Sequence, residues 1–291
     1  MQRLEERVTI KSRNRQYWKE ILAALLKIWP ELSSMEVRKI NPAACEAWAA
    51  RYSKTGSATR YNNTISILRH VLDVAKENGI IYANPADDLN RVKVRGKKLE
   101  LPTFSQFIAF INEIRNGHGR DSKNCADLAQ GLAYLGVRIG ESAEIIWKDV
   151  VFENEEITVK GDPEEATKNS EIRRVPMISQ AKELLLRMRT ARKKGVLTEK
   201  IFLVNECQKA MDRATKKTGM TRITNHDLRH FFATVSIESG VDIPPVSRWL
   251  GHKDGGALAM KTYGHLRREH SAAQAKKVSF AVVTPPLHIA A

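Results

Sequence analysis

The chain has 291 residues, which is enough for two domains of ordinary size. Its 42% hydrophobic and 28% charged residues exclude a disordered or fibrous protein and indicate packed globular domains. The formal charge of +15 favours nucleic acid as the partner, because an excess of Lys and Arg attracts polyphosphate and releases its counterions. A basic surface that serves only solubility is the alternative on charge alone.

The cysteines and the apolar stretches favour a cytoplasmic protein. Cys45, Cys125 and Cys207 are widely spaced and form no Cys-x-x-Cys pair, which argues against a disulfide framework or a structural zinc and fits a reducing compartment. No stretch approaches the roughly 20 apolar residues that a membrane helix requires. The N-terminal MQRLEERVTIKSRNRQ also lacks the apolar core of a signal peptide. We therefore expect no contact with a membrane.

From Ser12 to about Asn90 the sequence pattern is helical. The clearest helix is predicted between Ser57, which can cap its start, and Gly79, which can end it. Its apolar residues recur at steps of four and three, the spacing that lines one helix face. These residues are Tyr61, Ile65, Leu68, Leu72 and Ala75.

A basic stretch without periodicity separates two predicted domains. Asn84-Pro85 marks a turn, and RVKVRGKKLELP then combines dense positive charge with a glycine, as exposed linkers do. We place a helical domain at residues 1–92, a basic linker at 93–101 and a second domain at 102–291.

The second domain is predicted to be mainly helical with a small antiparallel β-sheet. A helix through CADLAQGLAYLG closes at Gly136. Short β-rich runs follow around Ile157–Val159 and Ile172–Val175, separated by polar turn residues. The predicted fold class is therefore mainly α, in two domains, with the small sheet confined to the second.

The sharpest local pattern begins at Thr224. Asp227 follows three residues later, just before an apolar run, and this capping-box arrangement predicts a helix start. His226 and Arg229 share a face of that helix, beside backbone N–H groups that favour an anion, so together they can form a phosphate site. A capped helix with a solvated histidine and arginine is the alternative.

Three further segments carry residues suited to phosphate chemistry. His252 follows a predicted helix end and is displayed at that terminus. Tyr263 follows a glycine pair, which is an unusual setting for a core residue, although a packed tyrosine is the alternative. Arg138 precedes Glu141 by three residues, and an arginine oriented by an acid can bind a phosphate with two hydrogen bonds. An ordinary surface ion pair is the alternative there.

The order of these motifs between Pro102 and His270 resembles the catalytic signature of the tyrosine recombinase (phage integrase) family. It comprises a G-x-R-x-x-E segment, a lysine before R-x-V-P, an H-x-L-R-H helix, an L-G-H and a Y-x-H. The resemblance implies a catalytic α+β domain at 102–291 and a helical core-binding domain at 1–92. One departure is a slightly longer connection between L-G-H and the tyrosine, which bears on the reach of Tyr263.

The resemblance implies a role for each matching residue. Arg138 and Arg229 match the arginine pair that grips the scissile phosphate, with Glu141 in a supporting position. The remaining matches follow in chain order: Lys168 as the acid that protonates the leaving 5′ oxygen, His226 as the histidine that assists proton transfer with the tyrosine, His252 as a phosphate donor and Tyr263 as the nucleophile. Lys160 lies on the same predicted hairpin and is a rival for the lysine role. Tyr17, Tyr61 and Tyr134 are poorer candidates for the nucleophile, because none follows the histidine motifs.

The implied reaction is site-specific cleavage and rejoining of DNA through a covalent 3′-phosphotyrosine, as in phage or mobile-element integration and excision. The covalent bond preserves the energy of the broken one, so no cofactor or metal is expected. Basic residues of the first domain and the linker can contact DNA phosphates, without reading sequence. They are Lys11, Arg13, Arg15, Lys54, Arg60, Arg91, Lys93, Arg95, Lys97 and Lys98.

The expected partners are double-stranded DNA and other copies of the chain. We expect a homo-tetramer on DNA, with a monomer in free solution, exchange of residues 278–291 between protomers, and accessory DNA-bending or directionality factors. A bacterial or phage-encoded protein associated with the nucleoid fits this role. Because the chain starts almost directly at the helices, an additional arm-binding domain is expected to be absent or lost. The alternatives are a catalytically inactive DNA-binding regulator and a type IB topoisomerase-like nicking and resealing enzyme.

Overall fold

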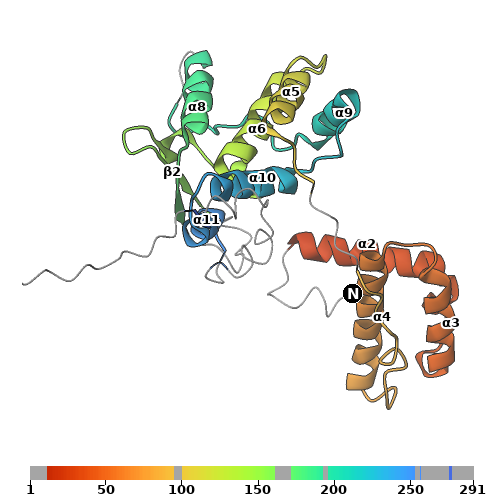
Figure 1. Ribbon diagram of the computed structural model, residues 1–291. Coiled ribbons are helices and arrows are strands. Elements are labelled where there is room, and N and C mark those ends of the chain that lie inside the picture. Colours follow the sequence, from red (N-terminus) through yellow and green to blue (C-terminus); the bar gives the residue numbers. More distant parts are fainter. Residues whose placement is uncertain are drawn as a thin grey trace, which may run out of the picture. The chain divides into compact units, whose positions relative to one another are not determined.

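The computed structural model describes residues 12–94, 100–160, 172–192, 196–252, 256 and 275–276, with side chains from residue 15 onward. The chain divides into two compact units, residues 1–98 and 99–291, and each is described by itself (Figure 1). None of the helices in the described ranges is long and apolar enough to cross a bilayer.

The first unit is helical, as its sequence predicts. Its elements are α2 (Ser12–Ile28), the 3₁₀ turns η1 (Pro30–Ser33) and η2 (Val37–Lys39), α3 (Pro42–Tyr52) and α4 (Ala58–Glu77). The predicted apolar stripe of α4 is confirmed, because all five of its residues are buried. The stripe packs in a core with Trp48, whose ring stacks on Trp29. The Ser57 cap is also confirmed, since its hydroxyl accepts from the Arg60 N–H.

The chain that leaves this unit is tied to α4 by side-chain hydrogen bonds. Asn62 accepts from the backbone N–H of Val92 at 2.9 Å and donates its amide to the Val92 carbonyl at 2.8 Å. Arg91 donates to the Ser66 hydroxyl at 2.9 Å. Residues 91–92 therefore have a defined path along α4, although they belong to no helix or strand.

The second unit is mainly helical with one small antiparallel sheet, which confirms the predicted fold class. Its helices are α5 (Phe104–Arg115), α6 (Ser122–Leu135), α7 (Ile139–Ser142), η3 (Trp147–Asp149), α8 (Ser179–Ala191), α9 (Gln208–Thr218), α10 (Asn225–Glu238) and α11 (Ile243–Leu250). Its strands are β1 (Val150–Val151), β2 (Glu156–Val159) and β3 (Arg173–Pro176). They are ordered β1-β2-β3, and Ile157 pairs with Val175 in the predicted hairpin.

The buried helix α6 is the centre of this unit, with α5, α8, α9 and α10 packed against it (Figure 1). It ends where the sequence predicts, at Gly136, whose φ of +62° is accessible to glycine at little steric cost. A Cβ at this position would lie 2.3 Å from the ring of Phe232 on α10. The glycine therefore brings the end of α6 into close contact with α10.

Candidate functional site

The start of α10 is fixed by the capping box that its sequence predicts. The Thr224 hydroxyl accepts from the Asp227 N–H at 3.2 Å, and the Asp227 carboxylate accepts from the Thr224 N–H at 2.8 Å. These bonds satisfy two of the N–H groups that a helix start leaves unpaired. His226 and Arg229 follow in the first turns, so the cap fixes where their side chains begin.

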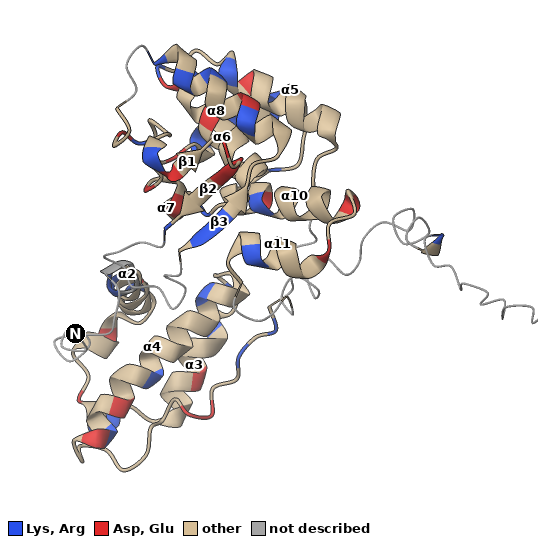
Figure 2. Ribbon diagram, turned by 90° about the vertical axis from the view of Figure 1, so that its left-hand side faces the viewer, with Lys and Arg blue, Asp and Glu red and all other residues tan. Residues whose placement is uncertain are grey.

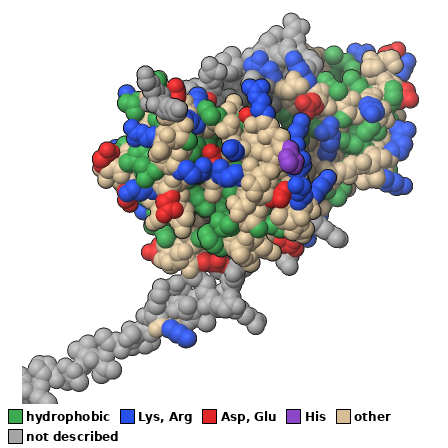
Figure 3. Space-filling model, turned by 90° about the horizontal axis from the view of Figure 1, so that it is seen from above, with side chains coloured by type: hydrophobic (Ala, Val, Ile, Leu, Met, Phe, Trp, Pro, Cys, Tyr) green, Lys and Arg blue, Asp and Glu red, His purple; other side chains and the backbone are tan. Residues whose placement is uncertain are grey.

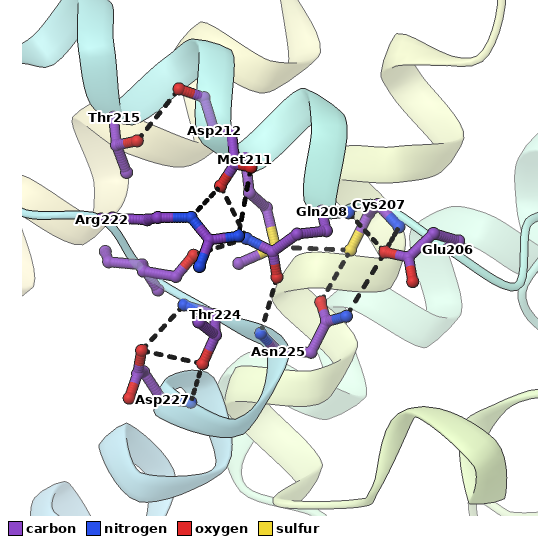
Figure 4. Close-up of polar contacts among 11 residues, drawn as sticks. Glu206, Cys207, Gln208, Met211, Asp212, Thr215, Arg222, Thr224, Asn225 and Asp227 are labelled. Carbon is purple, nitrogen blue, oxygen red and sulfur yellow. Dashed lines mark hydrogen bonds and ion pairs between the residues drawn. The ribbon is translucent and has the colours of Figure 1, made fainter. Parts of the chain in front are cut away.

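A second set of contacts ties the segment before α10 to α9 (Figure 4). Gln208 donates its amide to the Ile223 carbonyl at 2.9 Å and accepts from the Asn225 N–H at 3.2 Å. Arg222 binds both carboxylate oxygens of Asp212, at 2.9 and 3.2 Å. The entry to α10 is thus held by side chains of a neighbouring helix as well as by its own cap.

Arg229 points inward from α10 and is only 3% exposed. Its Nη1 donates to the Gly136 carbonyl at 2.7 Å, and its Nη2 donates to the Leu250 carbonyl. Those carbonyls close α6 and α11, so one guanidinium joins the ends of two helices to α10. The alternative of a solvated arginine at position 229 is therefore wrong.

Arg138 and Glu141 form the ion pair that the sequence favours, with a third partner from β3. Arg138 donates Nη1 to Glu141 Oε1 at 2.7 Å and its backbone N–H to Oε2 at 2.8 Å. Arg173 donates to the same two oxygens at 3.0 and 2.6 Å. Burial raises the pKa of Glu141, but the hydrogen bonds and charges of the two arginines more than offset burial and lower it to about 2. Glu141 is therefore a carboxylate at any physiological pH.

Three histidines gather beside Arg229. His226 and His230 lie one turn apart on α10, with ring centroids 4.4 Å apart and ring planes nearly perpendicular. Burial and the charge of Arg229 lower the pKa of His226, with Arg138 adding to the effect and Asp227 opposing it. Burial, then the charges of His226, Arg229 and His252, lower the pKa of His230 to about 4, again against Asp227. The rings of His226 and His230 are therefore neutral at pH 7.

The structure brings together four of the predicted residues around one end of α10: Arg138, His226, Arg229 and His252, with Glu141 behind Arg138. Lys168 and Tyr263 lie outside the described residues. Lys160, the rival lysine, is described and lies 2.5 Å from the buried carboxylate of Asp149. Its ammonium is thus engaged in an ion pair on the sheet side of the unit.

The structure describes the predicted DNA-contact residues to different extents. Lys54, Arg60, Arg91 and Lys93 are exposed, as a phosphate contact requires, whereas Arg15 is half-buried. Arg13 lies in α2 with its side chain undescribed, and Lys11, Arg95, Lys97 and Lys98 lie outside the described residues. Lys and Arg residues also occur along the helices of the second unit (Figure 2), and basic side chains are scattered over the face drawn in Figure 3.

Two residues of this site, Arg173 and His230, belong to the motifs R-x-V-P and H-x-L-R-H, but no role was predicted for either of them from the sequence. Arg173 shares a strand face with the buried Val175, and a charged residue on a buried face is a signal that alternation could have supplied. His230 follows His226 by four residues, so the two share a helix face. The partners of Arg173, Glu141 and Trp249, lie far away in the sequence, so local spacing does not identify them.

Comparisons with known proteins agree with this geometry. Residues 101–270 match the family model described as "Phage integrase family". The chain is 26% identical over 240 residues to "Prophage integrase IntS" of Escherichia coli K12, covering 79% of the chain but only 60% of the length of that relative. It is 24% identical over 271 residues to "Tyrosine recombinase XerC" of Lactobacillus leichmannii, covering 87% of the chain and 88% of the relative.

The fold also matches a solved structure, "Crystal structure of a lambda integrase tetramer bound to a Holliday junction". The TM-score is 0.72 at 18% identity, over 90% of this chain and 74% of the other. The family model covers more than half of the chain, and its span includes all six predicted catalytic positions. The chain is a member of the phage integrase family.

Proposed function

We propose that the chain is a tyrosine-type site-specific DNA strand transferase that cleaves and rejoins DNA through a covalent 3′-phosphotyrosine at Tyr263. The observation that carries this proposal is the cluster of Arg138, Arg229 and two histidines at one end of α10, inside the segment matched by the family. Residues from three separate stretches of sequence meet there: the start of α7, the first turns of α10 and the segment after α11. A purely structural ion pair would not require the histidines.

The two arginines would bind the non-bridging oxygens of the scissile phosphate. In-line attack on phosphorus concentrates negative charge on these oxygens, and fixed cationic donors stabilise that charge without reorganising. Arg229 is held by two backbone carbonyls, so its orientation is set before DNA arrives. Arg138 is more exposed, at 38% of its side chain, and can turn toward a substrate. His252 would add a third donor.

Tyr263 Oη would attack the phosphorus while His226 accepts the phenolic proton. A free tyrosine has a pKa near 10, so it requires a base or a positive pocket to become a nucleophile at neutral pH. A neutral His226 ring can accept that proton, and the lowered pKa of His226 keeps the ring neutral. The bond from phosphorus to the 5′ oxygen would break as Lys168 protonates that oxygen. Attack by a 5′-hydroxyl reverses the step and releases the tyrosine.

Site-specific exchange also requires several copies of the chain on double-stranded DNA. The matched λ integrase is described as a tetramer on a Holliday junction, which supports a homo-tetramer here. The exposed Lys54, Arg60 and Lys93 would contact phosphates from the first unit, so that the two units serve as core-binding and catalytic domains. Accessory factors would set direction, and the reaction would take place on nucleoid DNA in the cytoplasm.

A suicide substrate with a nick near the cut site tests this proposal. Loss of the short 5′-hydroxyl fragment traps the adduct, so wild-type protein should accumulate a covalent DNA complex and Tyr263→Phe should form none while binding DNA equally well. Arg138→Ala should slow the adduct by about 10²–10³-fold, which is typical of losing one transition-state donor. DNA binding without any wild-type adduct would contradict the proposal and favour a regulator. Adduct formation without strand exchange between two duplexes would favour a topoisomerase-like enzyme.

A further inference from the structure

Arg173 is a buried charge at the edge of the proposed site. Its side chain is 10% exposed, and its guanidinium donates three hydrogen bonds. Two go to the carboxylate oxygens of Glu141, and the third goes from Nε to the Trp249 carbonyl at 2.7 Å. These partners lie 32 residues before it, in α7, and 76 residues after it, in α11.

The neighbouring Arg174 has a different environment on the same strand. Its side chain is 74% exposed, and it approaches Glu156 only to 3.8 Å. Successive strand residues point to opposite faces, so Arg173 faces the interior with Val175 while Arg174 faces solvent. Figure 2 shows β3 in blue beside α11, which packs against it. The chain thus supplies a matched control one residue away.

Arg173 reaches the end of α11 because Gly251, the residue that ends this helix, has no side chain. Gly251 has a φ of +66°, and a Cβ there would lie 3.1 Å from Nη1 of Arg173. Arg173 binds the carbonyl of Trp249, and Arg229 binds the carbonyl of the next residue, Leu250. Two arginines therefore hold the consecutive carbonyls of Trp249 and Leu250, and only Gly251 separates these residues from His252.

Arg173 also determines how Glu141 is shared. Its two bonds occupy both carboxylate oxygens and leave Arg138 a single side-chain bond, from Nη1 to Oε1. A bidentate arginine pair is the strongest arrangement that a carboxylate offers. Without Arg173, the buried carboxylate would be left to Arg138, which would be drawn inward to satisfy it.

We propose that Arg173 is a positioning residue for the strand-transfer reaction: it keeps Arg138 turned toward the phosphate by occupying Glu141, and it fixes the backbone that carries His252. This inference rests on the proposed function. Arg173 contacts no reacting atom in this assignment and acts only through Glu141 and the end of α11. It is therefore distinct from the six residues of the predicted catalytic set.

The test measures the single-turnover rate of adduct formation on the nicked substrate at increasing protein concentration. This separates the maximal rate from the concentration that gives half of it. Arg173→Ala should lower the maximal rate roughly 10- to 100-fold, as expected for a small misplacement of a catalytic group, with half-saturation changed less than about threefold. Arg174→Ala should match the wild type in both. Should Arg173→Ala fail to fold, Arg173→Gln keeps a donor for the Trp249 carbonyl and should show the same loss.

A second change distinguishes positioning from mere stability. Adding Glu141→Gln to the Arg173 variant removes the charge that draws Arg138 inward, so the double variant should react several-fold faster than the single one. A structural role predicts a double variant that is slower still, and that result would overturn the inference. A wild-type maximal rate in either Arg173 variant would overturn it as well. If wild-type protein forms no adduct, the proposed function fails and this inference fails with it.

Discussion

The ionised state of Glu141 gives a stability prediction that can be worked from the structure. Its pKa falls from the ordinary 4.5 to about 2, which corresponds to about 3 kcal/mol of unfolding free energy at neutral pH, at about 1.4 kcal/mol per pKa unit. Glu141→Gln should therefore destabilise the second unit by about 3 kcal/mol at pH 7. The value agrees with the roughly 3–5 kcal/mol lost when one partner of a buried ion pair is removed.

The pH dependence of that difference tests its cause. A depressed carboxyl pKa stabilises the fold above the unfolded value of 4.5, and this stabilisation is lost as the pH falls toward 2. The difference between wild type and Glu141→Gln should shrink to roughly 2 kcal/mol at pH 3.5. Urea unfolding, read by hydrogen exchange of peptides from α6 and α10, isolates this unit. Glu144→Gln is the matched control, because that exposed carboxylate pairs with Lys200 at the surface.

A difference that is the same at both pH values would refute this account of Glu141. It would mean that the substitution acts through packing or neutral hydrogen bonds, and not through the charge that Arg138 and Arg173 stabilise. A loss below about 1 kcal/mol at pH 7 would also contradict it, because a surface pair contributes no more than that.

Three other predictions concern the backbone and the histidines. Gly136→Ala should lower the free energy of unfolding by about 2–4 kcal/mol in thermal or urea unfolding, because it combines a positive φ with a clash against the Phe232 ring. Gly219→Ala is the control: its φ is similar but its surroundings are open, so it should lower the free energy of unfolding by only about 1 kcal/mol. Burial lowers the pKa of His230 from 6.5 to about 4, so the free energy of unfolding should fall by roughly 2 kcal/mol between pH 7.5 and pH 5. His230→Gln should remove this loss, and a variant whose stability falls with pH as steeply as that of the wild type would contradict the prediction. Asn62→Ala removes two bonds to Val92 and should speed trypsin cleavage in the basic segment that follows; equal cleavage would show that the segment is held otherwise.

Local signals in the sequence predicted much of the fold. The cap at Ser57, the capping box at Thr224 and the left-handed end at Gly136 each depend on residues a few positions apart, and all three are present. The apolar stripe of α4 followed from periodicity, and the hairpin of β2 and β3 followed from β-rich runs separated by polar turn residues. Such features are decided by the chain near them, so a single sequence is sufficient.

The site was predicted less completely, because its contacts are long-range. The motifs gave Arg138, His226, Arg229 and His252, but not the way in which they are held. Arg229 binds carbonyls 93 residues earlier and 21 residues later, and neither partner could be identified from spacing. Arg173 stands in the quoted R-x-V-P motif, but its partners Glu141 and Trp249 are also distant in the sequence, so its role could not be predicted from spacing.

The burial of Arg229 has a genetic consequence. One guanidinium closes two helices by binding their terminal carbonyls, so its removal would leave acceptors unsatisfied in the interior as well as depriving DNA of a cation. Mutations at this codon are thus expected to be pleiotropic, yielding heat-labile or poorly accumulating protein alongside a chemical defect. A screen that scores only recombination would not distinguish the loss of stability from the chemical defect. Substitutions at the more exposed Arg138 should show the chemical defect with a smaller loss of stability.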